Sequence, residues 1–400
     1  MTPVAHPDVR EGETFPLGLT PSAKTHRYEA LDSLRGICAL LVCLFHFHAN
    51  GPIAPLAFVR GSWLFVDFFF VLSGFVIAAN YRQRLIDGKF LRGFVIVRFG
   101  RVYPLHLVML LAFLVVELLG TMLASGNGAQ RPMFDDHHSV FAIFTNLTLT
   151  QAFGLHDVLT WNQPSWSIAV EFWTYLLFAL VARWAGVALE KWLAVAVVAS
   201  IGTMLLVTPG GINLTYSWSL VRCIYGFAVG AIVWRLWHQS GREPALAYRG
   251  ATLVEIAAVV GVIAFVTLAG AAPVNVLASL VFGAAVLVFA RAGGGVSRLL
   301  LVGPFKTLGV LSFSIYMVHT FVQSRLDDVL AVVDKLTGTP FMTTQLLPSG
   351  KTVVLFGATP FQGVVLTLVM LVLVVGVSQL TWRLVELPGQ RLARRLAKPA

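Results

Sequence analysis

Ten long apolar runs constrain this chain more than any other feature of its sequence. Each run holds about 17 to 25 predominantly hydrophobic residues, the length that an α-helix needs to cross a bilayer. Hydrophobic residues make up 57% of the 400 residues and charged residues 12%, against roughly 25% charged residues in soluble domains. We therefore predict an all-α, polytopic membrane helix bundle of about ten transmembrane helices, near residues 34–50, 62–80, 102–124, 165–182, 192–208, 218–234, 252–270, 273–290, 307–325 and 361–382.

The distribution of Lys and Arg predicts how these helices are oriented. With a cytoplasmic N-terminus, 22 of the 29 Lys and Arg residues fall in cytoplasmic segments, as the positive-inside rule requires. Both termini are then cytoplasmic, and the chain divides into an N-terminal segment 1–33, a transmembrane domain 34–383 and a basic tail 384–400. The net charge of +10 reflects orientation and attraction to anionic membrane lipids. It forms no continuous basic stripe, so nucleic-acid binding is not expected.

An arginine and a histidine in the first apolar run are the first candidate site residues. Arg35 and His46 are eleven residues apart, which brings both side chains to nearly the same helix face and separates them by roughly 16 Å along the axis. Ionisable side chains inside a membrane are costly and mark functional sites by default. A long, thin ligand is therefore able to contact both residues.

A strongly basic segment, residues 81–104, follows the second apolar run and is predicted to be a cytoplasmic loop. Topology explains most of its charges, but Arg98 and Arg101 are spaced i, i+3 at the mouth of an apolar span. In a helix they would present two guanidinium groups on one side, and paired guanidinium groups suit phosphate. Arg35 is expected at the same membrane level. We predict that the three arginines bind phosphate.

A different set of ionisable residues is expected toward the outer side. It consists of His46, Asp67 near the start of the second run, and Glu171 in the fourth. An imidazole with an adjacent carboxylate is the minimal equipment for general-base catalysis. The alternative is that the carboxylates clamp helices together, and Arg222 is expected to meet one of them. His319 is either a second site residue or a satisfied interhelical donor.

No metal site is predicted. His48 lies two residues beyond His46, about 200° round the helix, so both cannot face one pocket within a helix. The three cysteines lie inside apolar runs without CxxC spacing. We interpret them as small hydrophobic residues.

Five short segments occur in order along nearly the whole chain: LDSLRG with His46, VDFFFVLSGF, RFGRVYP, PSWSIAVEFW and FSIYMVH. Together with the spacing of Arg35 and His46 they resemble the bacterial acyltransferase 3 family of integral-membrane O-acyltransferases. The resemblance implies acyl-CoA, usually acetyl-CoA from the cytoplasm, as a co-substrate without any permanently bound cofactor. It implies a carbohydrate or other hydroxyl acceptor and the bacterial inner membrane.

The resemblance and the helix geometry together lead to a hypothesis for the roles of the residues. Phosphates of CoA at Arg35, Arg98 and Arg101 would place the thioester near His46, the expected general base, with Glu171 or Asp67 orienting its ring. Candidate substrate-binding residues are Asn162, Ser165, Trp166, Arg222, Tyr316 and His319. An acyl-histidine or acyl-tyrosine relay is the alternative to direct transfer.

Two other classes of function compete with this interpretation. Intramembrane charges also mark the pathways of saccharide or anion transporters, but no repeat with broken helices is visible. A non-catalytic scaffold would leave the cost of burying these charges unexplained. The sequence does not specify the acceptor, which ranges from exopolysaccharide or lipid-linked glycan to a glycosylated metabolite. It does not distinguish a monomer from a homo-oligomer.

Overall fold

A computed structural model describes residues 28–126, 134–208, 210–240, 250–346 and 352–398. These described residues are 77% helical with almost no sheet, which confirms the predicted helical membrane fold. Within the described residues, seven helical runs are long and apolar enough to cross a membrane. The total of ten crossings and the cytoplasmic location of both termini stay predictions.

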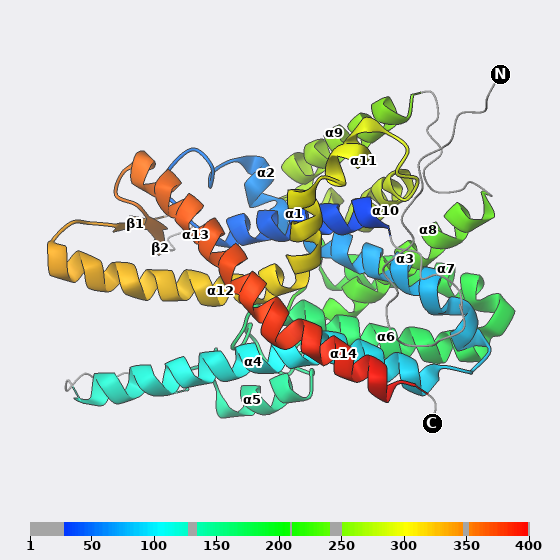
Figure 1. Cartoon of the computed structure of the whole chain (residues 1–400), viewed down its shortest axis with the longest axis horizontal. Coiled ribbons are helices and arrows are strands. Elements are labelled where there is room, and N and C mark those ends of the chain that lie inside the picture. The colour runs from blue at the N-terminus through cyan, green and yellow to red at the C-terminus, as the bar shows by residue number, and fades with distance from the viewer. Residues whose placement is uncertain (1–27, 127–133, 209, 241–249, 347–351, 399–400) are drawn as a thin grey trace, which may run out of the picture.

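Every predicted apolar run coincides with helical structure (Figure 1). The corresponding helices are α1 (Glu29–His46), α3 (Phe65–Ile86), α4 (Leu91–Gly126), α6 (Ser165–Ala185), α7 (Leu189–Val207), α8 (Ser219–Gln239), α9 (Ala251–Ala269), α10 (Ala278–Phe289), α12 (Gly303–Thr337) and α13 (Pro360–Thr381). The count of seven is smaller because α6 and α7 form one continuous run, while α1 and α10 lie outside the seven. Helix α10 has only 12 residues, although a short 3-10 helix precedes it.

Shorter elements connect these helices. They are α2 (Ala57–Arg60), α5 (Val140–Leu147), α11 (Gly295–Leu300), α14 (Leu387–Leu396) and an antiparallel hairpin of β1 (Met342–Leu346) and β2 (Thr352–Phe356), with Met342 opposite Phe356. A π-helical turn, Trp382–Glu386, joins α13 to α14. The predicted basic tail is thus largely a helix.

The prediction of a loop over residues 81–104 is wrong, while the cytoplasmic location of this segment stays a prediction. Helix α3 continues to Ile86 and α4 begins at Leu91, so only a short turn separates them. Pro104 lies inside α4, which a membrane helix tolerates because neighbouring helices and local adjustments satisfy the freed backbone groups. Arg98 and Arg101 are therefore helical, the condition on which their predicted pairing depended.

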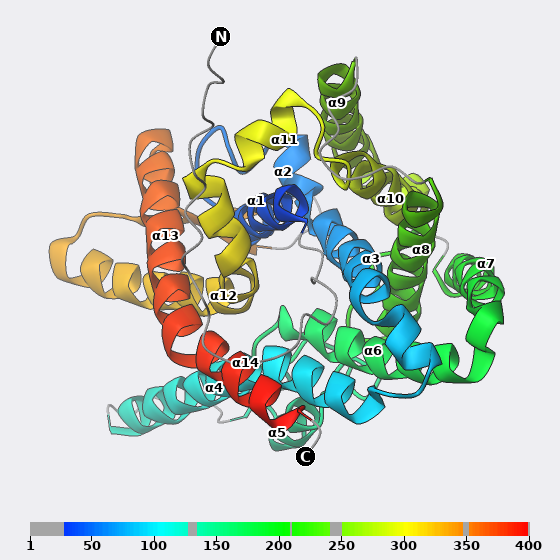
Figure 2. The same cartoon turned by 45° about the vertical axis from the view of Figure 1, so that its right-hand side comes forward.

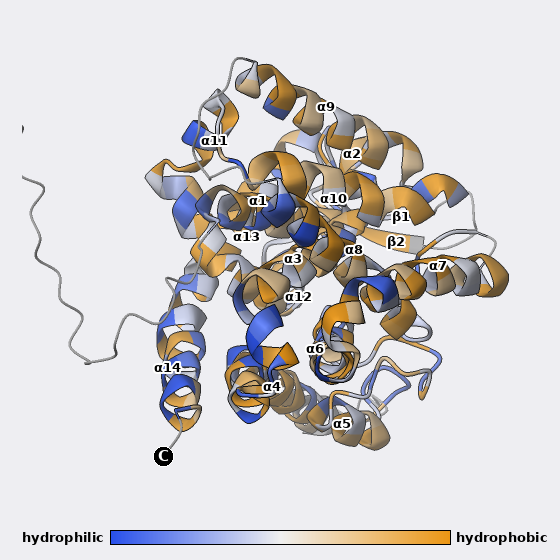
Figure 3. Ribbon diagram, turned by 90° about the vertical axis from the view of Figure 1, so that its right-hand side faces the viewer, coloured by the Kyte–Doolittle hydropathy of each residue, from blue (hydrophilic) through white to orange (hydrophobic). Residues whose placement is uncertain are grey.

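Hydrophilic residues gather at one end of the bundle. The beginning of α1 and the end of α14 lie toward the right in Figure 1, and the β-hairpin lies at the opposite end. Figure 3 looks onto the first of these ends and shows hydrophilic residues on α14 and the first turns of α4. Helix α9 instead exposes Leu253, Val260 and Leu268. An outward apolar face of this kind is expected where a helix meets lipid.

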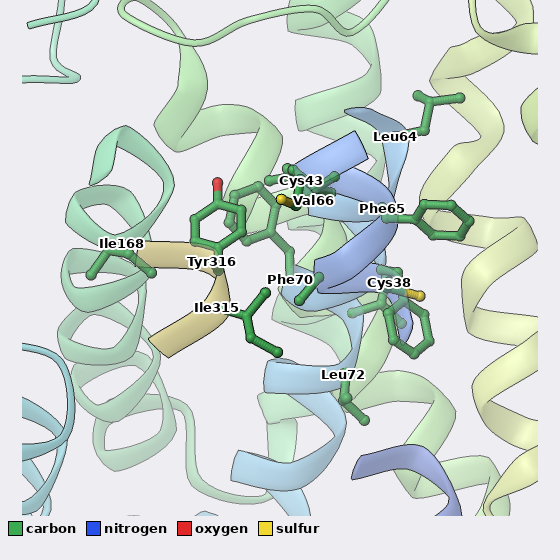
Figure 4. Packing of buried hydrophobic residues seen from close by; sticks show 14 of the residues in the cluster. Cys38, Cys43, Leu64, Phe65, Val66, Phe70, Leu72, Ile168, Ile315 and Tyr316 are labelled. Atoms are coloured by element: carbon green, nitrogen blue, oxygen red, sulfur yellow. The ribbon is translucent and has the colours of Figure 1, made fainter. Parts of the chain in front are cut away.

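Helices α1 and α12 pack together at the centre, and α3 packs against α8 (Figure 2). Glycines make the second contact close. A Cβ atom on Gly230 of α8 would lie 1.8 Å from the backbone oxygen of Val71, and one on Gly74 of α3 would lie 2.0 Å from that of Phe227. Buried apolar side chains of α1, α3 and α12 fill the interior (Figure 4).

The variant Gly230→Ala is expected to destabilise the fold by about 1 to 3 kcal/mol, because overpacking forces two backbones apart. Thermal unfolding in detergent measures the loss. Gly261→Ala on α9 is the matched control, since a Cβ there meets nothing within 4 Å. Equal unfolding temperatures for the two variants would contradict the close α3–α8 contact.

Candidate active site

A cavity of about 580 Å³ lies between α1, α3, α4, α6, α12 and α14. Arg35 of α1 and both Arg98 and Arg101 of α4 line it, so the fold brings together the three residues predicted to bind phosphate. Tyr28, just before α1, also lines the cavity. Burial raises the pKa of its phenol to about 12, so the group stays neutral at physiological pH.

The side chain of Arg35 is fixed by contacts with α12. Its Nε donates to Ser312 Oγ at 2.7 Å and its Nη2 to the carbonyl oxygen of Gly309 at 3.2 Å. Asp32 Oδ1 lies 3.2 Å from Nη2. The helices approach closely because Gly36 faces the backbone of Leu308, where a Cβ atom would lie 2.3 Å from the carbonyl carbon. Arg35 therefore presents a preorganised positive charge.

Arg98 and Arg101 have different surroundings. Arg98 Nη2 donates to the hydroxyl of Tyr81 at 2.9 Å, and its guanidinium carbon lies 4.9 Å from the centre of that ring. For Arg101 no hydrogen bond or ion pair is formed with any described residue, although it interacts electrostatically with Glu386 and Glu171. A guanidinium has five N–H donors. Arg101 thus keeps donors available for an anionic ligand.

Glu171 lies in the wall of this cavity and is not paired with His46. Its Oε1 accepts hydrogen bonds from Tyr175, at 2.5 Å, and from Ser73 of α3. The expectation that Glu171 orients the imidazole therefore differs from the structure. The reason is helix rotation: this face of α6 meets α3, whereas His46 faces α12.

The deep end of the cavity is lined by Phe69, Ser167 and Tyr316. The hydroxyls of Ser167 and Tyr316 are 2.8 Å apart and hydrogen-bonded, and the ring of Phe69 packs edge-on against Tyr316. Figure 4 shows Tyr316 on α12 near Ile168 of α6. His319 follows one turn later, its ring centre 5.8 Å from that of Tyr316. His46 itself is outside the cavity lining.

His46, which is partly buried, and His319, which is fully buried, form a pair across α1 and α12. His46 Nδ1 lies 2.9 Å from the carbonyl oxygen of Val42 and 3.3 Å from Nε2 of His319. His319 Nδ1 lies 2.7 Å from the carbonyl oxygen of Tyr316. A carbonyl only accepts, so both rings carry their proton on Nδ1. His319 Nε2 then accepts from His46 Nδ1–H, and the lone pair of His46 Nε2 is left for a proton.

Asp67 and Arg222 pair with each other. Arg222 Nε and Nη2 donate to the two carboxylate oxygens at 2.9 and 2.7 Å, and the side chains are 1% and 0% exposed for arginine and aspartate. The guanidinium also lies 5.4 Å from the ring centre of Trp166. The prediction that Arg222 meets an outer carboxylate is confirmed. The predicted alternative in which Asp67 orients His46 is wrong in this geometry, because Arg222 takes both of its oxygens.

Two other predicted substrate-binding residues bond within the protein. Asn162 donates to the carbonyl oxygen of Met317 and accepts from Thr320, both at 3.0 Å, which ties it to α12 beside His319. Ser165 Oγ accepts from Gln151 Nε2 at 3.2 Å. Contact of these residues with an acceptor stays a prediction.

Several polar residues of the cavity were missed by sequence reasoning: Ser73, Tyr81, Ser167, Tyr175, Ser312, Glu386, Gln390 and Arg394. A signal existed for Tyr175, which follows Glu171 by four residues and so shares its helix face. Ser73 and Ser167 lie inside two of the recognised segments. For Arg394 the sequence suggested only a contribution to the positive charge that orients the tail in the membrane.

Comparison with known proteins gives a consistent set of matches. A family model described as an acyltransferase domain matches residues 28–383. Protein 2 in the picA locus of Rhizobium radiobacter is 32% identical over 178 residues, covering 41% of this chain and 86% of that protein. Acyltransferase MdmB of Streptomyces mycarofaciens is 32% identical over 165 residues, covering 39% of this chain and 40% of MdmB.

A third match covers more of this chain. BcsY of Komagataeibacter xylinus, assigned as a membrane-bound transacylase, is 26% identical over 306 residues, covering 74% of this chain and 72% of that protein. No solved structure is significantly similar to this chain.

Proposed function

The chain belongs to the acyltransferase family whose model covers residues 28–383, and from this premise we propose that it transfers an acyl group from cytoplasmic acyl-CoA to a hydroxyl of a carbohydrate. The acyl group is acetyl in this proposal, and the enzyme works in the bacterial inner membrane. One observation carries the proposal: a cavity lined by arginines ends at Tyr316, one helical turn before His319, which pairs with His46.

The arginine end of the cavity suits the nucleotide part of the donor. Arg35 is held in place by α12, and Arg101 retains donors for a ligand. Charge-assisted hydrogen bonds between guanidinium and phosphate are among the strongest in proteins. The rise of roughly 16 Å between Arg35 and His46 on one helix is on the order of the length of an extended pantetheine arm. This supports a donor that binds lengthwise along α1.

His46 Nε2 acts as the general base in this mechanism. It takes the proton of the acceptor hydroxyl as the hydroxyl oxygen attacks the thioester carbonyl. The C–O bond forms, the C–S bond breaks, and the imidazolium returns the proton to the departing CoA thiolate. The carbonyl of Val42 and Nε2 of His319 hold the ring through Nδ1, the role for which the sequence suggested a carboxylate.

One local movement is required by this mechanism. The Ser167–Tyr316 hydrogen bond and the ring of Phe69 close the cavity before it reaches His46. The thioester must pass Tyr316 to meet the imidazole. A closed position also shields the thioester from the acceptor side, and hence from hydrolysis, until both substrates are bound.

The acceptor is proposed on chemical grounds. Acyl transfer by a general base needs a nucleophile that carries a removable proton, and the hydroxyls of carbohydrates supply such nucleophiles in quantity. We propose direct transfer by the membrane domain to an exopolysaccharide unit, a lipid-linked glycan or a glycosylated metabolite. CoA release from acetyl-CoA by purified protein, measured with a panel of such glycans, tests the proposal. Absence of glycan-dependent release and of acetyl-CoA binding would overturn it.

Arg101→Ala is expected to weaken CoA binding by about tenfold to a hundredfold, because it removes charge-assisted hydrogen bonds to phosphate. Calorimetric titration of the purified protein with CoA measures the change. Arg92→Ala is the control, since Arg92 lies on the same helix, is exposed and is outside the cavity lining. Unchanged affinity in the Arg101 variant would count against the phosphate site.

A further inference from the structure

The C-terminal helix α14 forms part of the cavity wall. It packs against α4, the helix that carries Arg98 and Arg101. Small residues permit the contact: a Cβ atom on Gly389 would lie 2.7 Å from Cγ of Pro104, and one on Gly100 would lie 2.2 Å from Cβ of Ala393. The position of α14 is thus specified by packing.

Glu386, in the π-helical turn before α14, fastens this helix to the bundle. Its Oε2 accepts from Ser314 of α12 at 2.8 Å, and its Oε1 accepts from Gln390 of α14 at 3.0 Å. Glu386 is 3% exposed and lines the cavity. A buried carboxylate with both oxygens bonded across helices makes α14 a fixed wall, and the same face of α14 carries Arg394 one turn beyond Gln390.

Arg394 is the arginine at the mouth of the cavity. It lines the cavity and is exposed, whereas Arg35, Arg98 and Arg101 are only partly exposed. Three helices, α1, α4 and α14, thus direct guanidinium groups to one volume. Arg395, next to it on α14, is exposed but lies outside the lining. Arg394 is therefore distinguished from its neighbour by position and not by charge.

We propose that Arg394 binds the 3′-phosphate of the acyl-CoA donor, an inference that rests on the proposed function and deepens it. Acyl-CoA carries its negative charge in two places, the pyrophosphate in the middle of the molecule and the phosphate on the ribose. The thioester has to enter deepest, toward Tyr316, so the ribose phosphate remains nearest the mouth. A guanidinium there meets it in the bidentate geometry that arginine favours.

The test compares two donors that differ in this one phosphate. The full-length protein is placed in zwitterionic phospholipid nanodiscs. Initial rates of glycan-dependent acyl transfer are then measured with acetyl-CoA and with 3′-dephospho-acetyl-CoA as the donor. Arg394→Ala is expected to raise KM for acetyl-CoA about fivefold, the range of an exposed ion pair. Its KM for the dephospho donor and its kcat stay at the wild-type values. Arg395→Ala leaves both donors unaffected.

Two outcomes overturn the inference while leaving the proposed function intact. The first is an equal rise in KM for both donors in Arg394→Ala, which would place the contact at the pyrophosphate. The second is no change with either donor while the wild type is active. Failure of the wild-type protein to use either donor overturns the proposed function and this inference together.

Gly389→Leu supplies a second variant that changes no charge. The larger side chain displaces α14 from Pro104, so preference for acetyl-CoA over the dephospho donor should fall toward that of Arg394→Ala. Size-exclusion chromatography verifies that the variant is folded. A folded Gly389→Leu protein with full preference for acetyl-CoA would contradict the proposed position of the phosphate.

Discussion

Replacing His46 with alanine is expected to lower acyl transfer by about 10² to 10⁴-fold, the usual contribution of a general base, without changing the affinity for acyl-CoA. The His46 imidazole lies outside the cavity lining and contacts His319, which follows Tyr316 by one turn, while the arginines lie at the other end. Loss of the base therefore slows the proton transfer of the chemical step and leaves the phosphate contacts in place. The measurements are glycan-dependent CoA release and calorimetric titration with CoA.

His48→Ala is the control for this variant. Helix α1 ends at His46, so His48 lies outside the helix, and its backbone oxygen accepts from the amide of Phe356 in the β-hairpin. Removing its side chain should leave turnover near that of the wild type. Turnover that persists in His46→Ala would show that His46 is not the general base. Turnover that is lost in His48→Ala, with His46 intact, would show the same.

The second large effect is on stability, in Arg222→Ala. This substitution leaves the carboxylate of Asp67 buried without its partner, and removing one partner of a buried ion pair costs about 3 to 5 kcal/mol. The loss is measured as the decrease in the temperature and denaturant midpoints of unfolding in detergent. It should appear without any donor present, because the pair is fully buried and lies outside the cavity lining.

The paired variant Asp67→Leu with Arg222→Met separates structure from catalysis. Replacing both charges with apolar residues of similar size is often neutral for stability, so this protein should recover most of the unfolding midpoint and a measurable rate of acyl transfer. A double variant that is stable and binds CoA but transfers no acyl group would show that Asp67 or Arg222 is needed for catalysis. That result would contradict the structural role that their position indicates.

Properties that depend on composition and spacing along one helix were predictable. The ten apolar runs gave the helical class because a bilayer leaves no alternative for a long apolar segment. The eleven-residue spacing of Arg35 and His46 gave a shared helix face, and both residues do face α12. The i, i+3 spacing of Arg98 and Arg101 predicted a joint site, and both line one cavity.

The partners of these residues were less predictable. The sequence grouped two carboxylates, Asp67 and Glu171, with His46, because all three are expected at a similar depth in the membrane. In the structure each has a different partner: Arg222 for Asp67, Ser73 and Tyr175 for Glu171, and His319 for His46. Depth follows from position in the sequence. The direction in which a side chain points depends on the rotation of its helix against each neighbour, which close contacts at residues such as Gly36 and Gly74 set.

The sequence by itself determined the membrane class, the helices, the family resemblance and three of the arginines of the cavity, Arg35, Arg98 and Arg101. Those properties are carried by local periodicity and by the cost of placing charge in lipid. Only the tertiary structure decided that His319 pairs with His46, and that the basic tail folds back as α14 to bring Arg394 to the cavity. These contacts join residues hundreds of positions apart, so they arise from helix packing, and no spacing within one helix encodes them.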